Sequence, residues 1–205
     1  MTSPRLGVVI LGAGASSRMG RPKLLLPWRG TTVIGHIIRQ WRELGAFQVT
    51  VVGRPRDSAL DAELDRVNFP AANRIFNPQA EQGMFSSIQA AGRWTGWEAE
   101  ISSWAIVLGD QPHLRADTLG QLLEFHAQNP QSICQPAFEG RGRHPVILPG
   151  AAFERLKESD ARDFSIYLKE FSQPAVKCVI NDPGLTLDMD VPGDYKRLIN
   201  LEASE

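Results

Sequence analysis

Hydrophobic and polar positions alternate along the chain between two kinds of segment. Short runs rich in valine and isoleucine predict buried strands. These runs are Leu6–Leu11, Phe47–Val52, Arg74–Phe76, Trp104–Leu108, Ser132–Pro136, Pro145–Leu148 and Val176–Ile180. Apolar residues at helical spacing predict helices between them. The helical stretches are Val33–Leu44, Leu60–Val67, Met84–Trp94, Leu114–Gln128, Ala151–Phe171 with a break near Ser159, and Pro192–Leu201. Strands that alternate with helices in this way indicate an α/β fold with a wound sheet.

Length and composition favour one domain over residues 1–205. The chain has 205 residues, of which 42% are hydrophobic, and contains no linker-like segment. Its 22 Lys+Arg residues balance 23 Asp+Glu, so we expect neither nucleic acid nor a membrane surface as a partner. No apolar stretch approaches the roughly 20 residues of a membrane span. Cys134 and Cys178 lie far apart without zinc-ligand spacing, which favours a reducing, cytoplasmic location without disulfides.

A glycine-containing segment, Leu11–Lys23, follows the first predicted strand. Ligands of open α/β sheets bind at the carboxyl ends of strands. Gly12 and Gly14 let the backbone approach a phosphate, and Arg18 and Lys23 supply positive charge, so the segment is a candidate phosphate cradle. A plain strand-to-helix turn with two solvated cations is the alternative.

Two specific nucleotide-binding motifs are excluded at this position. Ser17 stands where the dinucleotide fingerprint requires its third glycine. Lys23 follows proline and precedes leucine, which does not match a P-loop. Neither a dinucleotide-binding dehydrogenase nor a Walker ATPase is therefore favoured.

Acidic residues mark two further places. Asp110 follows the predicted strand Trp104–Leu108, where a carboxylate suits Mg²⁺. Asp188 and Asp190 alternate along an extended segment and are expected to share a face. Asp194 lies where it stabilises the start of the last helix. Turn formation before proline and a solvated acidic turn are the plainer interpretations of these motifs.

The segment Leu11–Pro27 resembles a long motif, L-A-A-G-x-S-x-R-M-G-x-P-K-x-L-L-P, which opens the molybdenum cofactor nucleotidyltransferases. This resemblance implies a three-layer α/β/α sandwich of the nucleotide-diphospho-sugar transferase type, with a mostly parallel, Rossmann-like sheet. It also implies that the loop holds the triphosphate of a nucleotide. The residues concerned are Leu11, Gly12, Ala13, Gly14, Arg18 and Lys23, with Arg18, Lys23 and Asp110 expected to be catalytic.

Other segments are similar to elements of the same family. Gly109–Pro112 matches G-D-Q-P, and Leu187–Tyr195 is similar to D-I-D-T-P-E-D-Y, which implies Asp110 and Asp190 as Mg²⁺ ligands with Asp188 undecided. The glutamine in the first motif, together with Ala13, is similar to the cytidylyltransferase branch. Residues that the resemblance places beside the base and ribose are Asn77, Gly83, Ser86 and Ser87. Those that it places beside the acceptor are Arg143 and His144.

The resemblance implies a magnesium-dependent transfer of CMP from CTP to molybdenum-bearing molybdopterin, with release of pyrophosphate and possible delivery of the product to a molybdoenzyme. Open alternatives are a related transferase that uses GTP or another phosphorylated acceptor, and a non-catalytic chaperone that holds the cofactor. A nicotinamide-dependent oxidoreductase is disfavoured. Departures from the family motifs at Phe85 and Arg143 are expected to fall near the base and the acceptor.

Overall fold

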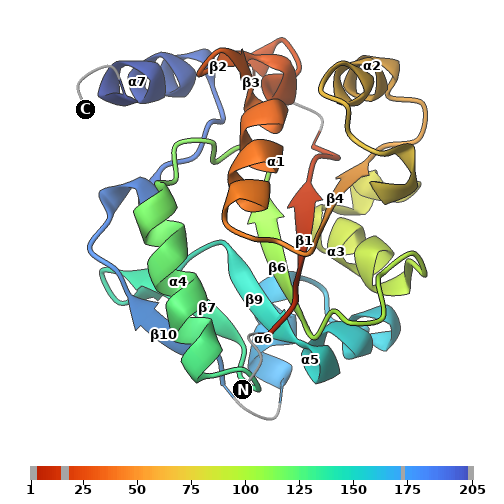
Figure 1. The fold of residues 1–205 in the computed structure, drawn as a ribbon, viewed down its shortest axis with the longest axis vertical. Helices are drawn as coiled ribbons and strands as arrows, with labels where there is room; N and C mark the ends of the chain where they lie inside the picture. The colour runs from red at the N-terminus through yellow and green to blue at the C-terminus, as the bar shows by residue number, and fades with distance from the viewer. Residues whose placement is uncertain (1–3, 15–18, 172–173, 203–205) are drawn as a thin grey trace.

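The computed structural model describes residues 4–14, 19–171 and 174–202. One eight-stranded sheet runs through it in the order β10-β7-β9-β6-β1-β4-β5, with β8 paired to β7 (Figure 1). Most neighbouring strands are parallel, and β9 is antiparallel to both β6 and β7. The strands are β1 (Leu6–Leu11), β4 (Gln48–Gly53), β5 (Arg74–Phe76), β6 (Ser103–Leu108), β7 (Cys134–Phe138), β8 (Arg141–Gly142), β9 (Val146–Pro149) and β10 (Val176–Val179).

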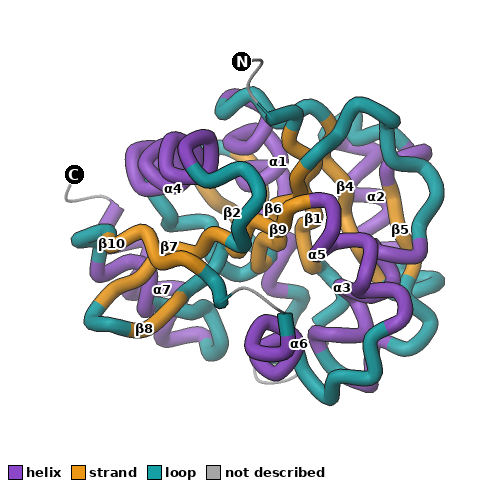
Figure 2. Tube along the Cα trace, turned by 90° about the horizontal axis from the view of Figure 1, so that it is seen from below, coloured by secondary structure: helices purple, strands orange, loops and turns teal. Residues whose placement is uncertain are grey.

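Helices cover both faces of this sheet, so the predicted three-layer α/β/α architecture is confirmed (Figure 2). The α-helices are α1 (Val33–Glu43), α2 (Ser58–Arg66), α3 (Met84–Arg93), α4 (Ala116–Gln128), α5 (Gly150–Arg155), α6 (Phe164–Glu170) and α7 (Pro192–Glu202). Side chains alternate across a strand, and in β1 Val8 and Ile10 pack with α1, α2, α4 and α7, whereas Val9 packs with α3, α5 and α6. The valine-rich strand is therefore buried on both faces.

Helix α1 shows how local sequence sets an element. Thr32 caps it, since its hydroxyl accepts a hydrogen bond from the Gly35 amide at 3.2 Å. Ile37 and Trp41 lie one turn apart on the buried face, each 1% exposed, and burying such a side chain stabilises the fold by about 1.5–3 kcal/mol. Gly45, at φ 83°, follows the end of the helix with a backbone conformation that glycine adopts easily.

A short hairpin between the opening loop and α1 was not predicted. Its strands are β2 (Pro27–Trp28) and β3 (Thr31–Thr32), joined by Arg29 at φ 42° and Gly30 at φ 76°. Two central residues with positive φ are typical of the tight turns that fit twisted strands. The Tyr195 hydroxyl of α7 donates to the Pro27 carbonyl at 2.7 Å, so the hairpin also anchors the C-terminal helix.

The sheet has a switch point between β1 and β6. In the sheet, β4 and β5 lie on one side of β1. The next parallel strand along the chain is β6, and it lies on the other side of β1. The loops after β1 and β6 therefore diverge, and such a crevice is the usual ligand site of an open α/β sheet. The Gly109 amide donates to the Leu11 carbonyl at 3.1 Å, and a Cβ at Gly109 would lie 2.6 Å from that oxygen. Glycine is required there for the two strand ends to meet.

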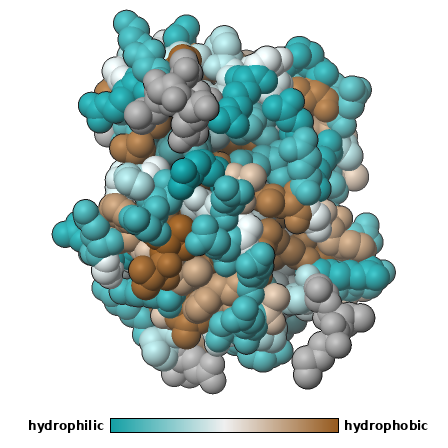
Figure 3. All heavy atoms as spheres, turned by 60° about the vertical axis from the view of Figure 1, so that its left-hand side comes forward, coloured by the Kyte–Doolittle hydropathy of each residue, from teal (hydrophilic) through white to brown (hydrophobic). Residues whose placement is uncertain are grey.

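Both cysteines are buried free thiols, as predicted, and burial raises the pKa of Cys134 to about 11. Trp97 packs edge to face against both Trp94 and Trp104, and Trp104 belongs to β6, so the three rings form a cluster against the sheet. On the face drawn in Figure 3, apolar side chains lie in patches interleaved with hydrophilic ones. Across the described residues, no helix combines the length and the apolar character needed to span a bilayer.

Candidate active site

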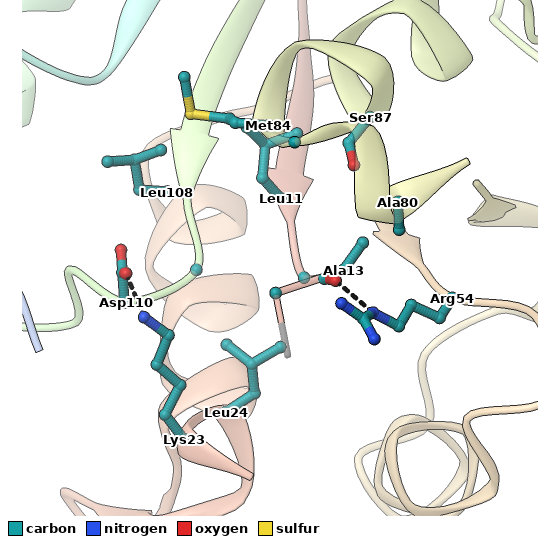
Figure 4. A pocket seen from close by; sticks show the side chains of 14 residues that line it. Leu11, Ala13, Lys23, Leu24, Arg54, Ala80, Met84, Ser87, Leu108 and Asp110 are labelled. Atoms are coloured by element: carbon teal, nitrogen blue, oxygen red, sulfur yellow. Dashed lines mark hydrogen bonds and ion pairs between the residues drawn. The ribbon is translucent and has the colours of Figure 1, made fainter. Parts of the chain in front are cut away.

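A cavity of about 270 Å³ opens at the carboxyl edge of the sheet, where the loops after β1, β4 and β6 meet the start of α3 (Figure 4). The position matches the switch point. The residues that line it are Leu11, Gly12, Ala13, Gly14, Lys23, Leu24, Arg54, Ala80, Gly83, Met84, Ser87, Leu108, Gly109 and Asp110. All four loop residues predicted to cradle a nucleotide, Leu11 to Gly14, are among them. Arg18 lies outside the described residues.

Lys23 joins the two carboxylates predicted as metal ligands. It begins a single 3₁₀ turn, Lys23–Leu25, directly after Pro22. Its ammonium lies 2.5 Å from Asp110 Oδ2 and 3.5 Å from Asp190 Oδ1, and it donates to the Met189 carbonyl at 3.4 Å. The cluster brings together three parts of the chain that are far apart in sequence.

Asp188 belongs to the same group of charges but has a different partner. Its Oδ1 accepts a hydrogen bond from Gln111 Nε2 at 3.0 Å. Burial, followed by the nearby negative charge of Asp110, raises the pKa of Asp188, and Asp190 adds to this shift. Asp188 and Asp190 thus face one site, as expected, with separate hydrogen-bond partners.

Asp194 holds the Asp190 segment in place. Its Oδ2 accepts hydrogen bonds from the backbone amides of Asp190 at 3.1 Å and Val191 at 3.0 Å. It lies in the first turn of α7, so an acid also suits the helix dipole there. The predicted helix-stabilising role is confirmed.

The donor chemistry at this end of the cavity fits a hard divalent cation. Among the described residues, no three His, Cys, Asp or Glu side chains form a ready-made metal cage. Mg²⁺ needs only one or two carboxylates when phosphate oxygens and waters complete its shell. Asp110 and Asp190, both directed at the Lys23 ammonium, provide that kind of set.

The residues predicted to lie beside the base fall into two groups, those that line the cavity and those that are buried behind its lining. Gly83 and Ser87 line the cavity. Asn77 and Ser86 are buried beneath it and are absent from its lining. Asn77 Nδ2 donates to the Ser86 and Ser87 hydroxyls at 2.8 and 3.0 Å, and its Oδ1 accepts from the Gln79 amide at 2.9 Å. These bonds fix the turn that ends in Gly83, whose φ of 99° suits glycine.

A second cavity, of about 710 Å³, contains both predicted acceptor residues, Arg143 and His144. Met84 borders both cavities, so they adjoin. The ring of His144 lies 6.0 Å from that of Phe164, measured between centroids. Burial lowers the pKa of His144 to about 4, against the opposing charge of Asp110, so its ring is neutral at pH 7.

The side chain of Phe85 lies in the core. Its ring is 6% exposed and packs against Phe164 and Tyr167 at centroid distances of 6.2 and 5.7 Å. It is also absent from the lining of the nucleotide cavity. The helical pattern of α3 turns the Phe85 side chain into the core, while its neighbour Met84 lines the cavity, and a position of Phe85 near the base stays a prediction.

Arg54 is the charged residue of the cavity lining that sequence reasoning missed. It follows the last residue of β4, and its Nε donates to the Ala13 carbonyl at 2.6 Å. Figure 4 shows it across the cavity from Lys23 and Asp110. Its place directly after a buried strand is the signal that identifies such residues, as it does for Asp110.

Residues 8–171 match the model of the MobA-like NTP transferase domain. The chain belongs to this family. MobA-like transferases are nucleotidyltransferases, and the sequence-based assignment of both family and enzyme class is confirmed.

Two curated relatives align over almost their whole length with this MobA-like chain. Nicotine blue oxidoreductase of Paenarthrobacter nicotinovorans is 31% identical over 204 residues, which cover 93% of this chain and 95% of that protein. Molybdenum cofactor cytidylyltransferase of Escherichia coli is 24% identical over 191 residues, which cover 91% and 92% respectively. The names of these two relatives thus describe different reactions, although both proteins align with this chain over almost their whole length.

Solved structures agree with the fold. The Mycobacterium sp. strain JC1 homologue of Rv0371c superimposes with a TM-score of 0.79 and 26% identity, covering 98% of both chains. The manganese complex of Rv0371c from Mycobacterium tuberculosis gives a TM-score of 0.70 and 22% identity, covering 96% of this chain and 98% of that chain. The three-layer architecture is therefore the same in these relatives.

Proposed function

We propose that the protein transfers CMP from CTP to the terminal phosphate of a molybdopterin-type acceptor, with Mg²⁺ as cofactor and pyrophosphate as the second product. The observation that carries this proposal is the cluster of Lys23, Asp110 and Asp190 at the switch-point cavity. The Escherichia coli relative named molybdenum cofactor cytidylyltransferase supports the choice of substrates.

The chain supplies positioning and charge for this reaction. An acceptor phosphate oxygen attacks the α-phosphorus of CTP, and the bond from that phosphorus to pyrophosphate breaks. Because the acceptor oxygen is already anionic, no side chain has to remove a proton from it. Asp110 and Asp190 would hold Mg²⁺, which when bound neutralises charge on the phosphate oxygens. Lys23 places a further positive charge beside them, and the backbone from Leu11 to Gly14 lines the path of the triphosphate.

The second cavity suits an anionic, planar acceptor. Phe164, Leu168 and Phe171 give it an apolar wall. Arg143, Lys169 and Lys177 line it as well, and no Asp or Glu side chain does so among the described residues. A pterin ring that carries a phosphate would pack on the apolar wall and pair with these cations. His144 and Met84 lie on the side of this cavity that adjoins the nucleotide site.

Thermal unfolding with nucleotides tests the proposed substrate. The purified protein is unfolded with CTP, GTP, ATP and NADH, each with and without Mg²⁺. A ligand at 100 times its Kd stabilises a protein by about 2.7 kcal/mol. We expect a magnesium-dependent rise in Tm with CTP that exceeds the rise with GTP or ATP.

The same experiment separates the other candidates. A rise in Tm with GTP alone would indicate the same nucleotidyl transfer with GTP as the substrate. A rise with NADH alone contradicts the proposal and favours redox chemistry, which the name of the Paenarthrobacter relative makes a necessary comparison. Binding of CTP without any later release of pyrophosphate indicates a chaperone for the cofactor.

A further inference from the structure

Arg54 is the arginine among the described residues that lines the switch-point cavity. Arg66, Arg74 and Arg115 each pair with a carboxylate. Arg54 is part-buried and, within the described residues, pairs with none. Its Nε donates to the Ala13 carbonyl at 2.6 Å, and its Nη1 and Nη2 have no hydrogen-bond partner in that part of the chain. Two guanidinium nitrogens thus remain for a ligand in the cavity that Arg54 lines.

The cavity has two chemically different ends. At one end Lys23 is engaged by Asp110 and Asp190, which is where phosphates and a cation belong. At the other end lie Arg54, Ala80 and Ser87, as Figure 4 shows. A nucleotide whose phosphates lie beside Lys23 extends its sugar and base toward Arg54.

Hydrogen-bond donors dominate the Arg54 end. The Ala13 carbonyl is already taken by Arg54 Nε. The Ser87 oxygen accepts from Asn77 at 3.0 Å, which leaves its proton to donate. The side-chain groups that remain are therefore the two Arg54 nitrogens and the Ser87 hydroxyl.

Resting on the proposed function, we infer that Arg54 reads the nucleotide base and selects one with two adjacent acceptors on an edge. Cytosine offers O2 and N3, and guanine offers O6 and N7, the pair to which arginine commonly binds in a bidentate manner. Adenine places an amino donor beside N7, and uracil places an N–H beside each carbonyl. Either base would leave a donor facing a donor, which is costly in a closed site.

Titration calorimetry with magnesium present tests this assignment. The ligands are CTP, GTP, UTP, ATP and inorganic triphosphate, and the proteins are the wild type, Arg54→Gln, Arg54→Lys and the control Arg56→Gln. Arg56 is exposed, lies two residues away and is not part of the cavity lining, and its substitution makes the same change of charge. The Tm of each unliganded variant reports folding.

We expect the wild type and Arg56→Gln to bind CTP or GTP at least about tenfold more tightly than ATP and UTP. Arg54→Gln brings the four nucleotides to within about threefold of one another and leaves the affinity for inorganic triphosphate unchanged. Arg54→Lys does not restore the selectivity, because an ammonium cannot present a planar fork.

Three results would overturn the inference. If the wild type binds all four nucleotides with equal affinity, the site does not select the base, although the proposed transferase function is not contradicted. If Arg54→Gln loses as much affinity for inorganic triphosphate as it loses for CTP, Arg54 is a phosphate contact. If Arg54→Lys keeps the base selectivity of the wild type, Arg54 only positions the Ala13 loop. A wild type that binds inorganic triphosphate and no nucleotide contradicts the proposed function itself.

Discussion

The ammonium of Lys23 lies 2.5 Å from the carboxylate of Asp110, although the two residues are 87 positions apart in the chain. Lys23 follows the loop after β1 and Asp110 follows β6, so their pairing closes the switch point of the sheet. The ammonium also lies 3.5 Å from Asp190 Oδ1, so one positive charge pairs with two carboxylates. The fold thus supports a charged site that none of these local sequences forms alone.

Asp110→Asn removes one of the two proposed metal ligands without changing side-chain size. We expect pyrophosphate release to fall by about 100-fold or more, with a Tm close to that of the wild type. Asp117→Asn is the matched control, because Asp117 is exposed in the first turn of α4 and loses the same charge. Its activity is expected to be unchanged, and a similar activity loss in both variants would contradict the assignment.

Lys23→Met removes the ammonium that pairs with the carboxylates of Asp110 and Asp190. Repulsion between these negative charges then lowers the unfolding free energy of the variant at pH 7 relative to the wild type. We expect activity to fall about 100-fold and millimolar Mg²⁺ to recover part of the lost Tm at pH 7. Lys157→Met, on the exposed surface, serves as the control. No recovery with Mg²⁺ would argue against the metal site.

Gly109→Ala tests the close contact between β1 and β6. The added Cβ would lie 2.6 Å from the Leu11 carbonyl oxygen and 2.9 Å from Leu24 Cδ2, so we expect a cost of about 1–3 kcal/mol in unfolding free energy. Gly120→Ala, in the interior of α4 with nothing within 4 Å, is expected to gain about 0.5–1 kcal/mol. Urea unfolding measures both, and equal effects would contradict the description of the switch point.

Burial lowers the pKa of all four histidines, so the stability of the fold is expected to depend on pH. Burial, with the charges of Arg29 and Arg39, lowers the pKa of His36 to about 4, and burial lowers that of His144 equally. Both rings stay neutral in the folded protein below pH 6.5, where the unfolded chain takes up protons, so unfolding free energy falls as pH drops from 6.5 to 4. A shift of this size corresponds to roughly 3 kcal/mol for each histidine.

Urea titrations of the wild type and His36→Asn at pH 7, 5.5 and 4 check this prediction. The variant starts less stable and loses less stability between pH 6.5 and 4, because it lacks one of the four histidines with a lowered pKa. Identical pH dependence in both proteins would show that His36 titrates normally in the folded state.

The sequence predicts the layers well because burial on both faces makes strands visible as unbroken apolar runs. Leu6–Leu11, which is such a run, is predicted to the residue, and so is the short edge strand Arg74–Phe76, in which Ile75 alone is buried. The β2–β3 hairpin is missed, since its strands of two residues are too short for any periodicity. Its only local signal is the Arg29–Gly30 turn.

The site is predicted unevenly for a physical reason. Lys23, Asp110 and Asp190 lie in recognisable motifs, and the fold brings them together. Asn77 and Ser86 belong to a motif as well, but hydrogen bonding draws them below the cavity. Arg54 has no motif, and its role depends on a contact with Ala13 across 41 positions that local sequence does not encode.

Release of pyrophosphate from CTP tests the central claim most directly. The purified protein is supplied with Mg²⁺, a phosphorylated molybdopterin acceptor, and CTP, GTP, ATP or UTP in separate reactions. The account predicts pyrophosphate in amounts that match a CMP-linked product, only when CTP, acceptor and Mg²⁺ are all present, and about 100-fold slower release from Asp110→Asn. No release from any nucleotide, together with oxidation of NADH when an aromatic electron acceptor is added, would contradict it.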